Sequence, residues 1–91
     1  MPDLLHEYWE DDVSGEFGLV HEHRDLQRPT LHPNARFVFS LFASSWFQAM
    51  QAYQERMDYG DYVPPDDFPD HSYTDAEQAE QEEYLRRRQV G

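Results

Sequence analysis

The 91-residue sequence has no cysteine, no lysine and only four glycines. Without cysteine it can form no disulfide, no thiolate metal site and no cysteine nucleophile, and small secreted domains usually depend on such cross-links. The absence of lysine beside seven arginines is a bias typical of GC-rich genomes, which favours a bacterial or phage source. We therefore expect a protein of a reducing cytoplasm.

Long apolar runs are also missing. No stretch approaches the roughly 20 residues that span a bilayer, and the N-terminus lacks the basic and apolar segments of a signal peptide. No GxSxG elbow, glycine-rich phosphate loop or dinucleotide fingerprint occurs, and a chain this short leaves little room for a water-excluding cleft. These absences predict a soluble protein that is not an enzyme and takes no cofactor.

Acidic residues are what the sequence has in excess. It carries 19 Asp and Glu against 7 Arg, a formal net charge of -12. Such a charge repels the phosphates of nucleic acids and anionic membranes, and it attracts basic protein surfaces. We expect a protein partner, possessing a basic surface, rather than direct contact with nucleic acid or membrane. A homodimer is the alternative, because the central strand and helix offer more apolar surface than one small fold can cover.

The N-terminal residues predict a β-hairpin. Residues 4–10 mix apolar and polar side chains at near alternation, which is typical of a half-buried strand. Gly15 follows in a polar turn, and residues 16–21 return as the second strand.

Residues 21–34 predict a connecting loop. Pro29 and Pro33 interrupt the segment, and proline cannot donate to a sheet ladder. Leu26 and Leu31 are the two side chains expected to anchor this loop on the core.

Residues 36–43 are the strongest strand pattern in the chain. An extended backbone places apolar side chains on both faces, which predicts a central, covered strand. One face would carry Phe37, Phe39 and Leu41, and the other Val38 and Phe42.

Residues 45–59 predict an amphipathic helix. Ser44 or Ser45 can cap its N-terminus, and Gly60 suits a left-handed C-cap. Its apolar stripe, more often core than docking surface, consists of Trp46, Ala49, Met50, Tyr53 and Met57.

The C-terminal third begins with residues 58–70, which contain five acids, three prolines and no base, and predict an extended acidic linker. Thr74 and Glu77 form a capping box that predicts a helix start. Because few apolar residues support that helix, we expect it to be marginal.

The whole pattern predicts a small α+β fold. Its antiparallel sheet, made of the N-terminal hairpin and a third strand, is packed by one amphipathic helix, with a marginal C-terminal helix. The predicted organisation is a folded core over residues 1–60, an acidic proline-rich linker over 61–73 and a C-terminal helix over 74–91.

The acidic linker is the candidate partner-binding site. Its aromatic side chains supply contact area, and its carboxylates supply steering and arginine pairing. The alternative is a solvated connector that charge keeps soluble. The candidate residues are Asp58, Tyr59, Asp61, Tyr62, Asp66, Asp67, Phe68 and Asp70.

The leading hypothesis for function is a non-enzymatic protein that binds another macromolecule through this acidic and aromatic surface. One alternative is a mimic of nucleic acid that inhibits a DNA- or RNA-binding protein, which requires carboxylates arranged in rows. A second is a metal-binding regulator that uses His6, His21 and His23. The spacing of these histidines matches no established metal motif, so no metal site is predicted.

Overall fold

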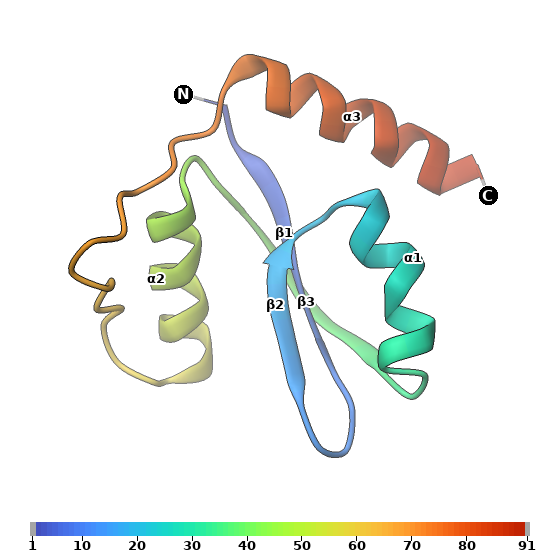
Figure 1. Cartoon of the computed structure of the whole chain (residues 1–91), viewed down its shortest axis with the longest axis horizontal. Coiled ribbons are helices and arrows are strands. Elements are labelled where there is room, and N and C mark those ends of the chain that lie inside the picture. Colours follow the sequence, from blue (N-terminus) through green and yellow to red (C-terminus); the bar gives the residue numbers. More distant parts are fainter. Residues whose placement is uncertain (1, 91) are drawn as a thin grey trace.

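Three antiparallel strands and three helices make up the fold in the computed structural model, which describes residues 2–90 (Figure 1). In chain order they are β1 (Leu4–Glu10), β2 (Gly15–Leu19), α1 (Glu22–Leu31), β3 (Arg36–Ala43), α2 (Trp46–Met57) and α3 (Asp75–Val90). The predicted small α+β fold is confirmed, with the hairpin, the third strand and the two predicted helices in place. The helix α1 is an addition to the prediction.

The sheet has the order β2-β1-β3, so β1 is its central strand. Leu4, His6 and Tyr8 alternate along β1 and are buried on the face that α2 covers. On that face the ring of Tyr53 stacks on Phe17, with 4.5 Å between centroids. The apolar stripe of α2 therefore packs against the sheet.

The opposite face of the sheet receives α1 and α3. The Arg28 guanidinium lies 4.2 Å from the centroid of the Trp9 ring, and Arg88 pairs with Glu7 at 2.8 Å. Trp9 and Glu7 alternate with the buried residues of β1, so they belong to this second face. The sheet is thus the middle of three layers.

The prediction that residues 36–43 form a central, covered strand is wrong, because β3 lies at an edge of the sheet. Phe37, Val38 and Phe42 are 50%, 42% and 64% exposed. Apolar residues on both faces usually indicate burial on both faces. Here α2 covers one face, while α1 and α3 make their contacts over β1 and β2, so the other face of β3 stays open.

A β-bulge changes which face of β3 carries Phe37. Tyr8 lies opposite Phe39 and Trp9 lies opposite Phe37, so Val38 is the extra residue in β3. Phe37 consequently shares a face with Trp9, and their ring centroids are 5.8 Å apart. The predicted grouping of Phe37 with Phe39 on one face is therefore wrong.

The loop predicted for residues 21–34 is also wrong, since α1 occupies most of it. The His21 ring accepts a hydrogen bond from the His23 amide at 3.0 Å and caps the helix. Pro29 lies near the end of α1, where a missing N–H removes only one internal hydrogen bond.

Ionic contacts, rather than the two predicted leucine anchors, hold α1 in place. Leu26 and Leu31 are 70% and 64% exposed. The Arg24 Nε donates to Glu16 of β2 at 3.1 Å, and Asp25 accepts a hydrogen bond from the Tyr84 hydroxyl of α3. Because its docking is polar, α1 has only two large apolar residues, Leu26 and Leu31, and lacks the apolar stripe that indicates a helix in a sequence.

The two ends of α2 follow the prediction in part. Ser45 caps the N-terminus by accepting from the Gln48 amide at 3.2 Å. At the other end Asp58, with φ of 60°, is the left-handed C-cap. The predicted C-cap at Gly60 is wrong: Gly60 also has positive φ, at 89°, but α2 has already ended.

The capping box of α3 is confirmed. The Glu77 amide donates to the Thr74 hydroxyl at 3.2 Å, and the Thr74 amide donates to the Glu77 carboxylate at 3.0 Å. Among residues 2–90, no helix has the length and hydropathy required to cross a membrane.

A buried glutamine fixes α3 to the sheet. The Gln81 side-chain oxygen accepts from the Leu5 amide at 2.7 Å, and its nitrogen donates to the carbonyls of Leu5 at 3.0 Å and Val20 at 3.1 Å. Gln81 is only 8% exposed. Its amide therefore satisfies backbone groups where β2 ends, and α3 docks through a polar contact rather than an apolar stripe.

Replacing Gln81 by alanine should lower the free energy of unfolding by about 1–3 kcal/mol, because the Leu5 amide loses its partner in a partly buried place. Urea unfolding followed by circular dichroism measures the change. The matched control is Gln78→Ala on the same helix, whose side chain reaches only the exposed Asp3 carbonyl at 3.3 Å. Equal losses in the two variants would contradict the assigned role of Gln81.

Candidate functional site

Residues 58–70, here named the acidic strap, contain no helix or strand and run back alongside α2 (Figure 1). Near its start the Tyr62 amide donates to the Gln51 side chain at 2.9 Å. At its end the Asp70 carboxylate accepts from the Phe47 amide at 2.9 Å, in the first turn of α2. The acidic strap is therefore attached to the first turn and to the middle of one helix.

The residues after the acidic strap enter the core. The Trp46 amide donates to the His71 carbonyl at 3.0 Å, and the Tyr73 amide donates to the Ser44 carbonyl at 3.0 Å. Tyr73 itself is 5% exposed. This anchor fixes the C-terminal end of the acidic strap relative to the sheet.

His6, on the central strand β1, contacts the side chain of Tyr73. Its side chain is fully buried, and its Nδ1 lies 3.0 Å from the Leu4 carbonyl, which can only accept. Nδ1 therefore carries the proton, and Nε2 accepts from the Tyr73 hydroxyl at 2.7 Å. Burial lowers the pKa of His6 to about 4, and burial also raises the pKa of Tyr73 to about 12. Both groups are neutral at pH 7.

The structure does not bring the three candidate metal ligands together. His6 is in the core with both ring nitrogens engaged, whereas His21 caps α1 and His23 lies exposed on that helix. Across residues 2–90, no group of three or more His, Asp or Glu side chains is placed to hold a metal ion.

The acids of the candidate site divide into two kinds. Asp58, Asp61 and Asp70 serve the strap itself: Asp58 ends α2, Asp61 accepts from Gln51 at 3.1 Å, and Asp70 binds the first turn of α2. Asp66 and Asp67 are exposed in a turn. The latter two carboxylates are free to face a partner.

The aromatic residues of the candidate site are also partly exposed. Tyr59 and Phe68 are 61% and 52% exposed, while Tyr62 packs edge-on against Phe47 with 5.7 Å between centroids. Val63, which is not among the predicted site residues, is 83% exposed in the same strap. A contact surface of mixed apolar and acidic character results.

Arginine pairing explains where negative charge remains. Six of the seven arginines form ion pairs with acids outside the acidic strap, and Arg56 lies over the Phe39 ring at 4.9 Å. Within the described part of the chain, no arginine or histidine lies within ion-pair distance of the five strap acids. Those acids are therefore uncompensated by neighbouring positive charge.

An apolar cavity of about 260 Å³, here named the strap pocket, opens beside the acidic strap. The exposed Phe68 and the ring of Trp46 line it, and the hydrogen bond between the His71 Nε2 and the Glu77 carboxylate, at 2.8 Å, lies along it. The hydrogen bond from His71 lowers the pKa of Glu77. The complete lining is Leu19, Trp46, Phe68, His71, Tyr73 and Glu77.

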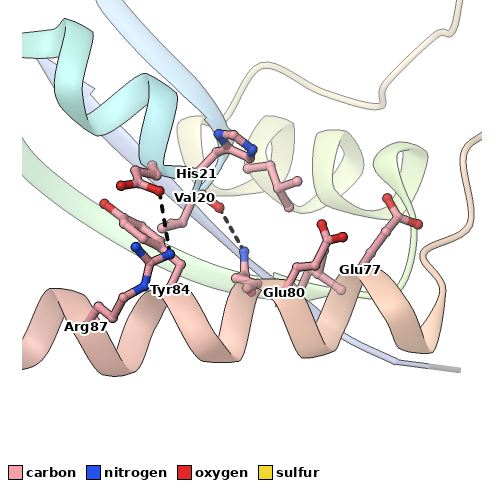
Figure 2. Close-up of a pocket in the computed structure, with 10 residues that line it drawn as sticks. Val20, His21, Glu77, Glu80, Tyr84 and Arg87 are labelled. Atoms are coloured by element: carbon pink, nitrogen blue, oxygen red, sulfur yellow. Dashed lines mark hydrogen bonds and ion pairs between the residues drawn. The ribbon is translucent and has the colours of Figure 1, made fainter.

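A second cavity, of about 380 Å³, separates α3 from the end of β2 and the start of α1 (Figure 2). Glu77 and Glu80 project from α3 on the side that faces His21. Arg87 and Glu22 form an ion pair across this cavity at 3.5 Å. It shares Leu19 and Glu77 with the strap pocket, so the two cavities adjoin.

The residues of the strap pocket come from β2, α2, the acidic strap, the segment that follows the strap, and the first turn of α3. Sequence reasoning missed it because these segments are far apart in the chain and none carries a local motif.

Comparison of the chain with protein-family models, curated proteins and solved structures finds no match.

Acid should destabilise the fold through His6. The pKa of His6 is about 4 in the folded state and 6.5 in the unfolded state. Between pH 6.5 and pH 4 the unfolded chain therefore binds more protons than the folded chain. The free energy of unfolding consequently falls as the pH drops from 6.5 towards 4. From pH 7 to pH 5 the loss should be about 2 kcal/mol, measured by urea unfolding. The control His23→Gln should keep this slope, and His6→Phe should reduce it. An unchanged slope in His6→Phe would refute the assignment.

Proposed function

We propose that this protein is a non-enzymatic binding protein that holds a basic surface of another protein against the acidic strap. The observation that carries the proposal is the set of five strap acids without a positive partner, next to exposed aromatic residues and an apolar cavity. An acidic segment that serves only solubility needs no apolar cavity beside it.

Charge and apolar contact have separate parts in this proposal. The net charge of -12 accelerates the encounter with a basic protein, and Asp66 and Asp67 then pair with its arginine or lysine side chains. A neighbouring apolar side chain of the partner fills the strap pocket around Phe68, because a buried apolar anchor supplies most of the affinity in such interfaces. The partner segment is therefore expected to place an apolar residue next to basic ones.

The attachment of the acidic strap favours binding. The hydrogen bonds to Gln51 and to the Phe47 amide hold the strap against α2 before any partner arrives. A segment that is already ordered loses less conformational entropy when it binds. The strap thus offers its acids in a fixed arrangement.

Affinity capture from a bacterial host lysate, with elution along a salt gradient, tests the proposal. The wild type should retain a basic protein that elutes as salt screens the charges. The double variant Asp66→Asn/Asp67→Asn and the variant Phe68→Ala should each reduce its recovery at least tenfold.

The matched control is Glu82→Gln/Glu83→Gln, which removes two charges from an exposed part of α3 and should leave recovery unchanged. Equal recovery of the partner by Asp66→Asn/Asp67→Asn and by the wild type, or retention that does not fall with salt, would contradict the proposal.

Duplex DNA added as competitor identifies the partner class. Displacement by DNA supports the nucleic-acid mimic, and its absence supports a basic protein surface of another kind.

A further inference from the structure

A second interaction surface lies on β3, away from the acidic strap. Phe37, Val38 and Phe42, here named the β3 strip, are all at least 42% exposed. β3 pairs with β1 on one side only, so the peptide groups along its other side have no partner strand. An edge strand with exposed apolar side chains is a template for pairing with another strand.

The distribution of charge selects a second copy of this chain as the occupant. Residues 31–54 contain no acid, although the whole chain carries -12. Arg36 is the one charged residue of β3, and it is paired with Glu10 at 3.4 Å. A basic partner finds no carboxylate here to pair with. Two copies of an acidic protein, in contrast, repel each other least where they meet through an acid-free segment.

We propose that β3 pairs antiparallel with β3 of a second copy, forming a homodimer with a continuous six-stranded sheet. The bulge at Val38 interrupts the regular backbone, so the new ladder is limited to residues 39–43 and is centred on Leu41. In that register Phe42 lies opposite Ser40 of the other copy, on the same face. The small Ser40 leaves room for the large ring.

The same arrangement separates the positive charges. Arg36 is five residues from the centre of the ladder, so the two arginines of a dimer lie roughly 33 Å apart along the strands. That separation exceeds the Debye length of about 8 Å at physiological salt. Antiparallel pairing therefore joins the two strips without a like-charge clash. Both strips lie on the same face of the extended sheet.

Salt distinguishes this proposal from the proposed function. Screening should strengthen the dimer, because it reduces the repulsion between two chains of -12 charge and leaves apolar contact intact. Screening should weaken the capture of a basic protein by the acidic strap. Each proposal can therefore fail while the other stands.

Sedimentation velocity of the full chain, over a concentration series at low and high salt, measures the association. The wild type should form a dimer whose dissociation constant decreases with added salt. Phe42→Lys should raise that constant at least tenfold. The matched control is Phe68→Lys in the acidic strap, which makes the same substitution at a phenylalanine of similar exposure and should leave the dimer unchanged.

Val38→Lys provides a second variant at an exposed position, and circular dichroism of both β3 variants checks that they remain folded. A monomeric wild type at all concentrations and salt levels overturns the proposal. Equal dissociation constants for Phe42→Lys and Phe68→Lys also overturn it. Asp66→Asn/Asp67→Asn should not weaken the dimer, although it weakens strap binding, and this difference keeps the two results separate.

Discussion

The buried ring of His6 is the contact on which the arrangement of the molecule depends. It stacks on Phe17 of β2 at 5.7 Å, lies 6.1 Å from the ring of Trp46 on α2, and hydrogen-bonds the Tyr73 hydroxyl after the acidic strap. Three separate segments therefore meet at one imidazole of β1. An aliphatic residue in its place would fill space but leave the Tyr73 hydroxyl without a buried acceptor. Together with the backbone hydrogen bonds of Trp46 and Tyr73, this polar contact fixes the C-terminal end of the acidic strap relative to the sheet.

Polar docking on the other face of the sheet explains how a small acidic chain keeps two helices attached. The helices α1 and α3 bury few apolar residues, and they contact the sheet through the Gln81 amide and through arginines that reach Glu16 and Glu7. Partly buried ion pairs of this kind depend on good geometry, because desolvation opposes their attraction. Arginines used in this way are no longer available to neutralise the acidic strap. The stability of one face and the negative charge of the proposed binding surface thus have a common origin.

The acidic strap and the β3 strip are opposite in chemistry. The strap has five uncompensated carboxylates beside an apolar cavity, whereas the strip has exposed apolar side chains and no acid. Salt acts on them in opposite directions, which gives a simple physical separation of heterologous binding from self-association. The two proposals also use different elements, since β3 forms an edge of the sheet and the acidic strap lies along α2.

The sequence by itself determined the elements that depend on local pattern. Alternation along residues 4–10 indicated β1, and the extended apolar pattern of residues 36–43 indicated β3. A capping serine at position 44 or 45 indicated the start of α2, and the capping box indicated α3. It also indicated residues 58–70 as an extended acidic and aromatic segment. These features depend on side chains within a few positions of one another, so periodicity and capping chemistry are enough to find them.

Only the tertiary structure decided the helix α1, the edge position of β3, the burial of His6 and the strap pocket. α1 is held by polar contacts to distant residues, Glu16 and Tyr84, so its docking face carries no apolar stripe. Strand order and the bulge at Val38 follow from pairing with β1, and the pocket requires side chains from five segments. Which acids lack a partner was likewise decided by where the arginines lie. Each of these properties depends on contacts between residues far apart in the chain, and such contacts leave no local signature.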